Sequence, residues 1–564
     1  MAEEFSEEEK KLLAPFVSNL DKPVFVLRNL PEVVKGALFS RYSRSTKSLR
    51  RTLLDEFILN KEIGFNADSS GFENLIANSQ ERVWQSKLPS NLDIATEKAE
   101  AFYDRVLVGY GDDSVAELAG AHIALEDISI VATKIVEDAR IGLSPLEKST
   151  RYVYFDQKDS SGNWRYYRDS ELESLDGYIE TCDLLFETYA KLIPKISKFV
   201  SEKMPESERA KLSERAFESV IRSKTCDIIR GILPASTKTN MGFFGNGRAY
   251  EYLITKMYAD SLLEIRELAN AMQTELRTTI PSFVKRPDTA HGKDMQKYIQ
   301  ETRLDGFGAQ MPPEPEAEDV VLVDYDKEAE NKIVAAALYP YTNRSMHSLL
   351  QDSRHMTMEP GAPSSPNASQ SKTQDHRNKI IDAYVGNRVN RRHKPSRAFE
   401  MPYYTFDICG NFGAYRDIHR HRVLTQQRQA LGCSHGYTLP KEIVESGHES
   451  EFKAAMDSAK QAWEQIAKKH PLQAQYTVPL AYRIRWHMTM NLREAIHFCE
   501  LRSAMQGHID YRRIAQKMSK EIERVHPNLA KHMKFVDMSE YGFERLEAEK
   551  KLDLKLKTLG ELGK

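Results

Sequence analysis

The sequence predicts a protein of mixed helices and strands, α/β or more narrowly α+β, in which long helices outnumber short strands. Helical periodicity of apolar residues runs through residues 170–203, 207–231 and 247–277. Brief apolar runs, such as Val320–Val323, are typical of strands. The two halves of the chain also share one order of parts, which indicates an internal duplication.

Length and composition indicate a globular protein of two to four domains. The chain has 564 residues, of which 41% are hydrophobic and 29% charged, and its formal net charge is -2. This balance excludes a broadly basic nucleic-acid coat, so any basic site must be local. The N-terminus lacks the pattern of a signal peptide, and no apolar run approaches the roughly 20 residues of a membrane helix. Five cysteines without a CxxC pair are typical of reduced thiols, so we expect a cytoplasmic protein.

The first half is predicted to contain an N-terminal helix at 1–20 and a domain at 21–300. Val24–Leu27 is typical of a strand. Gly142 and Pro145 break the helical pattern, so we expect a loop at 142–152 that leads into a strand at 152–155. The remaining expected elements of this half are helices at 31–62, 93–108, 114–140, 170–203, 207–231 and 247–277.

The second half is predicted to begin after a linker at 301–319, because proline and acidic residues make that segment stiff and solvated. We expect a domain at 320–540, an exposed loop at 359–374 and a charged C-terminal helix at 541–564. The other expected elements are strands at 320–323 and 401–408, and helices at 376–386, 413–430, 440–470, 491–505 and 508–526.

One spacing supports the internal duplication. Pro234 precedes Asn246 by 12 residues, and Pro479 precedes Asn491 by 12 residues. Asn-x-Arg follows in both places, as 246–248 and as 491–493. Because the order of helices and strands around these residues also agrees, we predict two related halves.

The segment Tyr415–Arg422 concentrates three arginines and two histidines in an apolar stretch that predicts a buried helix. Three interpretations are open. The segment forms a solvated basic face, or it contributes a metal site, or it lines a pocket for an anion such as a nucleotide phosphate. A metal site of His419 and His421 is disfavoured, since residues two apart on a helix point to different sides.

Two parts of the chain together resemble the signature of the flavin-dependent thymidylate synthases, Arg-His-Arg-x-x-Ser-x-Asn-Glu-x-Ser-x-Arg-Tyr. The second half contains Arg-His-Arg at 420–422 but lacks Ser-x-Arg-Tyr. The first half lacks Arg-His-Arg, and it keeps five other signature residues: Ser144, Glu147, Ser149, Arg151 and Tyr152. The resemblance implies two tandem thymidylate synthase-like domains, each a mixed sheet with long helices, which together form a pseudo-dimer.

Other positions of the family are divided between the halves in the same way. The arginine before the proline is kept as Arg230, whereas the second half has Gln475. The arginine after Asn-x-Arg is kept as Arg502, whereas the first half has Met257. The resemblance therefore implies one composite nucleotide site, built by both halves, and a degenerate second site.

The resemblance also implies residue roles. It implies FAD as cofactor, methylenetetrahydrofolate and NADPH as co-substrates, no metal, and methylation of dUMP to dTMP. Arg420 and Arg502 would be catalytic, because they would stabilise the enolate that develops on the uracil ring. The residues expected to bind substrate are Glu147, Ser149, Thr150, Arg151, Arg230, Asp417, Arg420 and Arg502. The residues expected to bind FAD are Arg420, His421, Arg422, Asn491, Arg493, His497, Ser114, Glu117, Asn246 and Arg248.

Alternatives to these roles stay open. Ser149 is also typical of a hydroxyl that caps a loop, and Arg420 or Arg502 could form a salt bridge with Glu500 or Asp417. Because Asp417 stands near a family glutamine and Asp112 near a family histidine, a related one-carbon transfer such as hydroxymethylation is a second hypothesis. A non-enzymatic nucleotide or RNA binder is a third, which arginines at 41–51 and 388–397 favour, although aromatic interleaving is lacking. A homodimer would reproduce the four lobes of the family tetramer, and nucleic acid and membrane partners are not expected.

Overall fold

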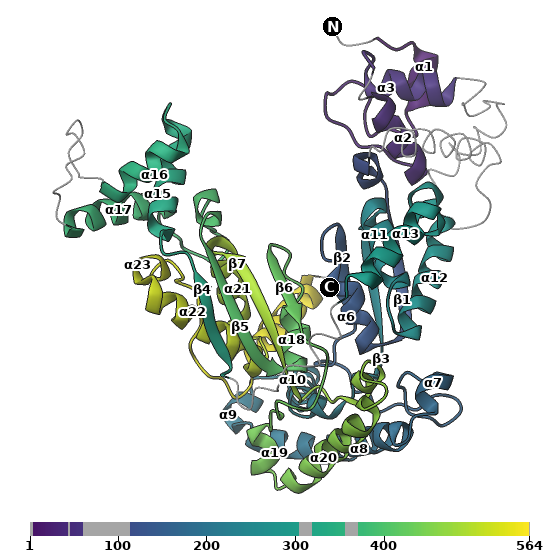
Figure 1. The fold of residues 1–564 in the computed structure, drawn as a ribbon, viewed down its shortest axis with the longest axis vertical. Helices are drawn as coiled ribbons and strands as arrows, with labels where there is room; N and C mark the ends of the chain where they lie inside the picture. Colours follow the sequence, from purple (N-terminus) through teal and green to yellow (C-terminus); the bar gives the residue numbers. More distant parts are fainter. Residues whose placement is uncertain (1–3, 43–44, 60–112, 304–317, 356–369, 563–564) are drawn as a thin grey trace. The chain divides into compact units, whose positions relative to one another are not determined.

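The computed structural model describes residues 4–42, 45–59, 113–303, 318–355 and 370–562 (Figure 1). The chain divides into two compact units. Unit 1 comprises Met1–Glu126, Ile135–Glu147 and Asn240–Met311. Unit 2 comprises Asp127–Lys134, Lys148–Thr239 and Pro312–Lys564. The units therefore do not follow chain order, and the domain limits 21–300 and 320–540 remain a prediction.

Unit 1 is built on a three-stranded sheet with the order β1 (Gly120–Ser129), β3 (Lys238–Asn246), β2 (Leu143–Glu147). Strands β2 and β3 are antiparallel, with Leu143 opposite Gly245 and Glu147 opposite Met241. The chain passes from β3 directly into α11 (Gly247–Tyr258), because the side chain of Asn246 caps the first turn. Other helical segments of unit 1 are α1 (Glu7–Leu13), α2 (Glu32–Tyr42), α3 (Leu49–Thr52), the π-helix Leu53–Ile58, the 3-10 turn Asp113–Leu118, α12 (Leu263–Arg277) and α13 (Ala290–Glu301). Helix α6 (Ile130–Asp138) begins in unit 2 and ends in unit 1.

Unit 2 contains a four-stranded antiparallel sheet with the order β4 (Val320–Tyr325), β5 (Tyr403–Asn411), β7 (Arg483–Asn491), β6 (Leu424–Arg428). Side chains of β7 alternate, so Ile484, Trp486 and Met488 are buried while their neighbours are partly exposed. Helix α22 (Ile509–Val525) packs on β4 and β5 (Figure 1). Its buried residues include Ile514, Ala515, Met518 and Ile522.

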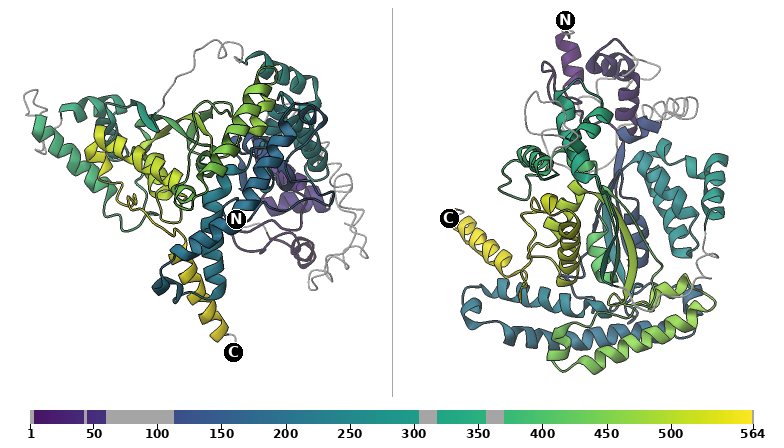
Figure 2. Two further views of the ribbon diagram at one scale, coloured as in Figure 1. Left: turned by 90° about the horizontal axis from the view of Figure 1, so that it is seen from below. Right: turned by 60° about the vertical axis from the view of Figure 1, so that its left-hand side comes forward.

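Long helices complete unit 2. Helix α8 (Tyr178–Lys203) packs against α10 (Glu214–Ile229) and against α20 (Glu449–Ala467), as the right-hand view of Figure 2 shows. The remaining helices of unit 2 are α7 (Ser170–Glu173), α9 (Glu206–Arg209), α15 (Ala329–Leu338), α16 (Met346–His355), α17 (Gln370–Val385), α18 (Phe412–Ile418), α19 (Lys441–Glu445), α21 (Leu492–Arg502), α23 (Pro527–Ala530) and α24 (Leu546–Leu562). None of the helices described is long and apolar enough to cross a membrane.

The predicted repeat is visible in local structure. Asn491 caps α21 just as Asn246 caps α11, and in both halves a strand precedes the cap. Within unit 2, the segments around Pro234 and Pro479 pair with each other. Ala235 N donates to Val478 O at 2.9 Å, and Leu480 N donates to Leu233 O at 2.9 Å. The two bonds are equivalent, because each joins the residue after one proline to the residue before the other proline.

Several expectations were wrong. Both sheets are antiparallel rather than mixed. The helix expected at 114–140 is a 3-10 turn, then β1, then α6, because pairing with β3 overrides the helical pattern. The strand expected at 152–155 has no ladder partner and is irregular, and Val24–Leu27 contributes a single bridge, from Leu27 to Val17. The loop expected at 142–152 contains β2.

The helix expected at 413–430 is also wrong, and this matters for the site. Helix α18 ends at Ile418, and the chain turns through Arg420-His421-Arg422 into β6, which pairs with β7. Strands β3 and β7 were not predicted. The expected helix at 93–108, Asp112 and most of the linker and the 359–374 loop lie outside the described residues.

Candidate functional site

Arg151 is buried in unit 2 at the centre of a network of charges. The turn that precedes it is closed by Ser149, whose Oγ accepts a hydrogen bond from Arg151 N at 3.2 Å. Arg151 is 6% exposed. Its Nε and Nη2 donate to the carboxylate of Asp227 at 2.7 and 2.6 Å, and its Nη1 donates to the hydroxyl of Tyr511 at 3.1 Å. The loop-capping interpretation of Ser149 is thus observed, and every nitrogen of the Arg151 guanidinium is engaged.

Arg230 lies beside this pair, in the 3-10 turn that follows α10. Its Nη1 is 2.9 Å from Oδ2 of Asp417, and the arginine is 3% exposed. Its Nη2 is buried and has no hydrogen-bond partner among the described residues. Burial raises the pKa of Asp417, but Arg230 and Arg151 outweigh burial and lower it to about 2. Asp417 is therefore ionised at neutral pH.

A third arginine connects the two halves of the sequence. Arg416 Nη1 donates to Thr150 Oγ1 at 3.4 Å, and both residues are buried. We call Arg151, Asp227, Arg230, Arg416 and Asp417 the arginine cluster. Burial raises the pKa of Asp227, yet Arg151, His508 and Arg230 lower it well below its usual range. Two arginines of the cluster are therefore each paired with an aspartate, and its first-half members meet its second-half members inside unit 2.

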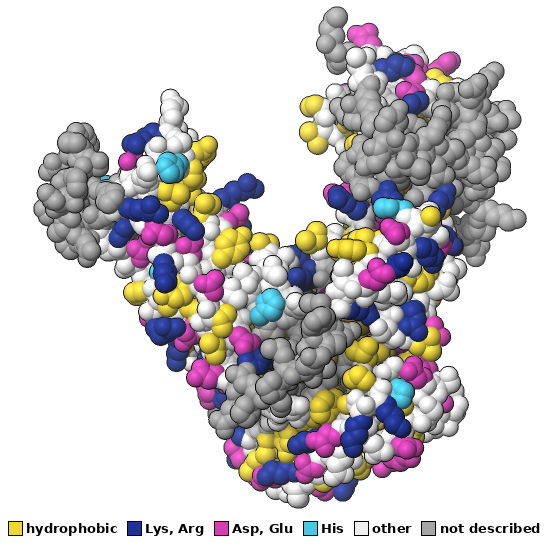
Figure 3. Space-filling view, in the orientation of Figure 1, with side chains coloured by type: hydrophobic (Ala, Val, Ile, Leu, Met, Phe, Trp, Pro, Cys, Tyr) yellow, Lys and Arg dark blue, Asp and Glu magenta, His cyan; other side chains and the backbone are white. Residues whose placement is uncertain are grey.

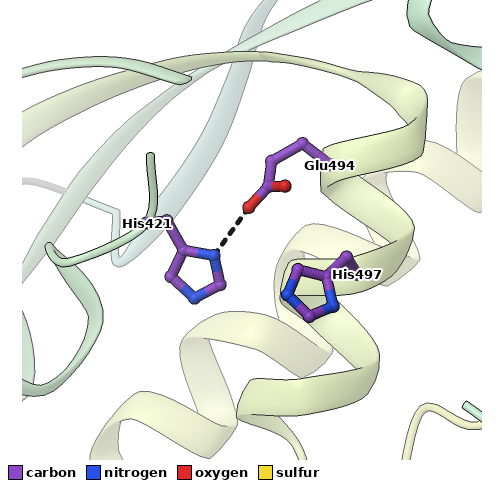
Figure 4. A group of neighbouring side chains, drawn as sticks. All are labelled: His421, Glu494 and His497. Atoms are coloured by element: carbon purple, nitrogen blue, oxygen red, sulfur yellow. Dashed lines mark hydrogen bonds and ion pairs between the residues drawn. The ribbon is translucent and has the colours of Figure 1, made fainter. Parts of the chain in front are cut away.

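A second group of predicted residues forms a hydrogen-bonded chain. His421 Nδ1 lies 2.6 Å from a carboxylate oxygen of Glu494 (Figure 4). Arg502 Nε donates to His421 Nε2 at 2.9 Å. Burial and the charge of Arg420 lower the pKa of Arg502, against the nearby Tyr511 and Asp417. Arg151 also donates from Nη2 to Gln506 O at 3.3 Å, four residues after Arg502, so this chain borders the arginine cluster.

His421, Glu494 and His497 are also a possible set of metal ligands. Their nearest donor atoms lie within 4.8 Å of one another, and two histidines with a glutamate are ligands that zinc accepts. Against this, a metal on Nδ1 of His421 would move the proton to Nε2, where it would face the N–H of Arg502. The geometry thus favours the hydrogen-bonded chain, and the expectation of no metal remains a prediction.

Two other second-half residues that were expected to bind FAD make hydrogen bonds within the fold. Asn491 Oδ1 accepts from Glu494 N at 2.9 Å. Arg493 donates from Nε to Pro395 O at 2.7 Å and lies 3.1 Å from Glu400. By contrast, Nδ1 of His497 is buried without a hydrogen-bond partner among the described residues, and burial lowers the pKa of that ring to about 4. Arg420 is half-buried and Arg422 exposed in the turn before β6.

Five of the first-half candidates belong to unit 1, whereas the arginine cluster belongs to unit 2. Glu147 ends β2, and Ser114 lies in the 3-10 turn before β1. Glu117 and Arg248 form an exposed ion pair of 2.7 Å, and Asn246 caps α11. The pair of Glu117 and Arg248 corresponds to Glu400 and Arg493 in the other half, so the repeats share this contact.

The sequence reasoning missed Asp227, Tyr511, His508 and Glu494. Asp227 stands three residues before Arg230 in a helical pattern, which places both side chains on one face, and this spacing could have revealed it. His508 Nε2 lies 3.0 Å from Asp227 O. Next to these residues, a cavity of about 200 Å³ is lined by side chains that include Asp227, Arg230 and His508.

In the two arginine-rich stretches that favour an RNA binder, several arginines form ion pairs within the protein. Arg388 is buried and pairs with both carboxylate oxygens of Glu500 at 2.8 and 2.6 Å. Glu500 is thus paired with Arg388, and Asp417 with Arg230. Arg41 pairs with Glu56 and Arg51 with Glu9. On the face drawn in Figure 3, basic and acidic side chains of the described residues are interspersed.

Comparisons with known proteins agree with this picture of two repeats. A family model described as thymidylate synthase complementing protein matches residues 67–282 and 321–528. The chain is 42% identical over 557 residues to a UPF0159 protein of Chlamydia muridarum, covering 97% of this chain and 98% of that protein. It is 34% identical over 487 residues to a UPF0159 protein of Thermoplasma acidophilum, covering 81% and 93%. It is 27% identical over 229 residues to a flavin-dependent thymidylate synthase of Mycobacterium sp. (strain KMS), covering 40% and 84%.

Proposed function

We propose that this chain, which belongs to the thymidylate synthase complementing protein family, is a flavin-dependent thymidylate synthase. The reaction is the reductive methylation of dUMP to dTMP, with methylenetetrahydrofolate as carbon donor and NADPH as reductant. The observation that carries the proposal is the arginine cluster, where Arg151 and Arg230 meet Arg416 and Asp417 although they come from different repeats. A buried group of three arginines is suited to an anionic substrate.

In the proposed site, Arg230 is the principal phosphate ligand. Its Nη2 is a buried donor without a partner among the described residues, and a phosphate oxygen would satisfy it. A charge-assisted hydrogen bond of this kind contributes about 1.5–3 kcal/mol. Arg151 acts less directly, because Asp227 and Tyr511 already occupy its donors. It holds the Ser149–Arg151 turn in place, and the hydroxyls of Ser149 and Thr150 remain able to contact the nucleotide.

The chemical step needs stabilisation of negative charge on the uracil carbonyl oxygens. Arg502 borders the cluster and is assigned this role, together with Arg420 in the neighbouring turn. Both side chains are only partly exposed, and a partly water-excluded site strengthens their electrostatic effect. Glu147 belongs to unit 1, and its contact with substrate is proposed from the family resemblance alone.

The proposed cofactor is FAD, which supplies the hydride and takes part in methylene transfer when it is bound. The residues fit such a group, since His497 has a buried Nδ1 without a partner among the described residues, and its ring lies 5.6 Å from that of His421 in the turn before β6. His421, Arg422 and His497 would contact the flavin nucleotide. Asn491 and Arg493 would support them, because they cap α21 and fix it to Pro395.

A second candidate is a related one-carbon transfer to a pyrimidine, such as hydroxymethylation. Asp417 favours it, because an ionised carboxylate 2.9 Å from Arg230 competes with the phosphate of a nucleotide. Such a site would discriminate among pyrimidines by charge. The same reaction mixture separates the two candidates, since dTMP and a hydroxymethyl nucleotide differ in mass.

The test begins with the colour of the purified protein. A flavin absorbance near about 450 nm, either as purified or after FAD is added, is expected. The protein is then incubated with dUMP, methylenetetrahydrofolate and NADPH, and the products are separated by mass spectrometry. Formation of dTMP is the expected result. Protein that binds no FAD and forms no modified pyrimidine would refute both candidates.

We also propose that the protein is a homodimer, because two chains of two repeats supply the four lobes expected from the family resemblance. Light scattering at several concentrations gives the mass directly. A monomer at every concentration would contradict this assembly and would leave the test of dTMP formation unaffected.

A further inference from the structure

Glu494, His421 and Arg502 form a chain of hydrogen bonds whose direction is fixed. The guanidinium of Arg502 can only donate, so Nε2 of His421 must accept its hydrogen bond of 2.9 Å. The proton of the imidazole therefore sits on Nδ1 and is donated to Glu494 at 2.6 Å (Figure 4). His421 is thus a neutral link between a carboxylate and a guanidinium.

The first repeat has lost all three members of this chain. Strand register defines the corresponding positions, because Leu424 stands opposite Met490 in one sheet and Leu143 opposite Gly245 in the other. By this register His421 corresponds to Arg140, and the Asn-x-Arg spacing makes Ala249 the counterpart of Glu494 and Met257 that of Arg502.

A contact that is present in both repeats behaves differently. The ion pair of Glu400 and Arg493 is present in the first repeat as Glu117 and Arg248. The shared pair is a property of the repeat fold. The Glu494–His421–Arg502 chain is kept only in the half that carries Arg-His-Arg, so its three members act as one unit.

The arrangement restricts the Arg502 guanidinium. With Nε donating to His421, the position of Nε and the plane of the planar guanidinium are constrained. Arg151 of the arginine cluster donates from Nη2 to Gln506 O at 3.3 Å, four residues after Arg502, so Arg502 lies near the edge of the cluster. Oriented donors act on a transition state without reorganisation, which is why a support of this kind affects the rate.

We propose that Glu494 and His421 are positioning residues that hold Arg502 in the orientation from which it stabilises charge on the pyrimidine carbonyl. This inference rests on the proposed function. Neither residue contacts the substrate in this role. Loss of an orienting partner costs about 10-fold to 100-fold in related settings, so Glu494→Ala should lower kcat by that factor and leave KM for dUMP nearly unchanged.

Three variants separate positioning from simple structural support. Glu494→Gln keeps a carbonyl oxygen that can accept from Nδ1, so it should retain activity within about threefold of the wild type. In an Arg502→Lys background the Nε contact is absent, so adding Glu494→Ala should have little further effect. Glu451→Ala, which removes a carboxylate from α20 that pairs with Lys195, is the matched control. Independent, additive losses in the double variant would overturn the proposal.

A readout without turnover keeps this test separate from the test of the function. Nitrogen-15 spectra of histidine-labelled protein should show His421 with its proton on Nδ1, and the His421→Gln variant identifies the resonance. Glu494→Ala should weaken this preference. A wild-type protein that makes no dTMP would refute the proposed function, whereas a proton on Nε2 of His421 would refute the hydrogen-bonded chain itself.

Discussion

The ion pair of Arg151 and Asp227 allows a quantitative prediction about stability. Their side chains are 7% and 8% exposed, and the pair is bidentate. Replacing Asp227 by alanine leaves Arg151 and Arg230 buried close together without that carboxylate, next to His508. Removal of one partner from a buried pair costs about 3–5 kcal/mol.

The two single variants should differ. Arg151→Ala leaves Asp227 with Arg230 and His508, which still lower its pKa, so the remaining charge is partly compensated. We therefore expect Arg151→Ala to be less destabilising than Asp227→Ala. In the double variant neither charge remains, and its stability should exceed that of Asp227→Ala.

The assay is thermal unfolding followed by the tryptophan fluorescence of the full chain, at one protein concentration. About 1 kcal/mol shifts the transition of a large domain by roughly 2–4 °C, so Asp227→Ala should lower it by several degrees. Hydrogen exchange around residues 148–155 reports whether the turn opens. If Asp227→Ala were as stable as the wild type, or if the double variant were the least stable of the three, the assignment of this pair would be wrong.

Four further predictions follow from the same contacts. Arg230→Ala should weaken dUMP binding by about tenfold to a hundredfold in a calorimetric titration, since one charge-assisted donor is lost, whereas Gln475→Ala at the equivalent position should leave binding within about threefold. Asp417→Asn should strengthen dUMP binding at pH 7, because the competing carboxylate is ionised there, and an unchanged or weaker affinity would contradict the competition. The pKa of Asp417 is lowered by folding, so the stability that this carboxylate contributes is complete above its unfolded pKa near 3.8 and is lost as the pH falls toward about 2. The unfolding midpoint of Asp417→Asn should therefore depend less on pH over that range than the midpoint of the wild type. All five cysteines are buried, and burial raises the pKa of Cys182 and Cys226 to about 12, so a thiol reagent should react slowly with native protein and completely after denaturation.

The sequence predicted the long helices of unit 2 well, because their apolar faces are buried with a regular period. Helix α8, for example, buries Leu185, Tyr189, Leu192 and Ile196. Strand β4 was predicted from its apolar run. Strand β7 was missed although Ile484, Trp486, Met488 and Met490 alternate with polar residues, because arginines at the start of the strand obscured the period of two.

The arginines of the site were predicted in part, whereas the carboxylates that pair with them were mostly missed. The resemblance supplied Arg151, Arg230, Arg420 and Arg502. It did not supply Asp227, because a carboxylate inside a helical pattern carries no sign of the arginine that it will meet 76 residues away. The turn at Arg420–Arg422 was also hidden, since only pairing of β6 with β7 distinguishes it from a continued helix.

The pairing of the segments around Pro234 and Pro479 has a consequence for how the chain folds during synthesis. Ala235 and Ser236 donate to Val478 and Tyr476, so this part of unit 2 cannot be completed until about 240 further residues have been made. At roughly 5–20 residues per second, the wait is on the order of 10–50 s. Meanwhile the apolar faces of α8 and α10 lack the partners that come from the second half. The early part of the chain should therefore depend on chaperones during translation, and a fragment that stops at residue 300 should aggregate when it is produced alone.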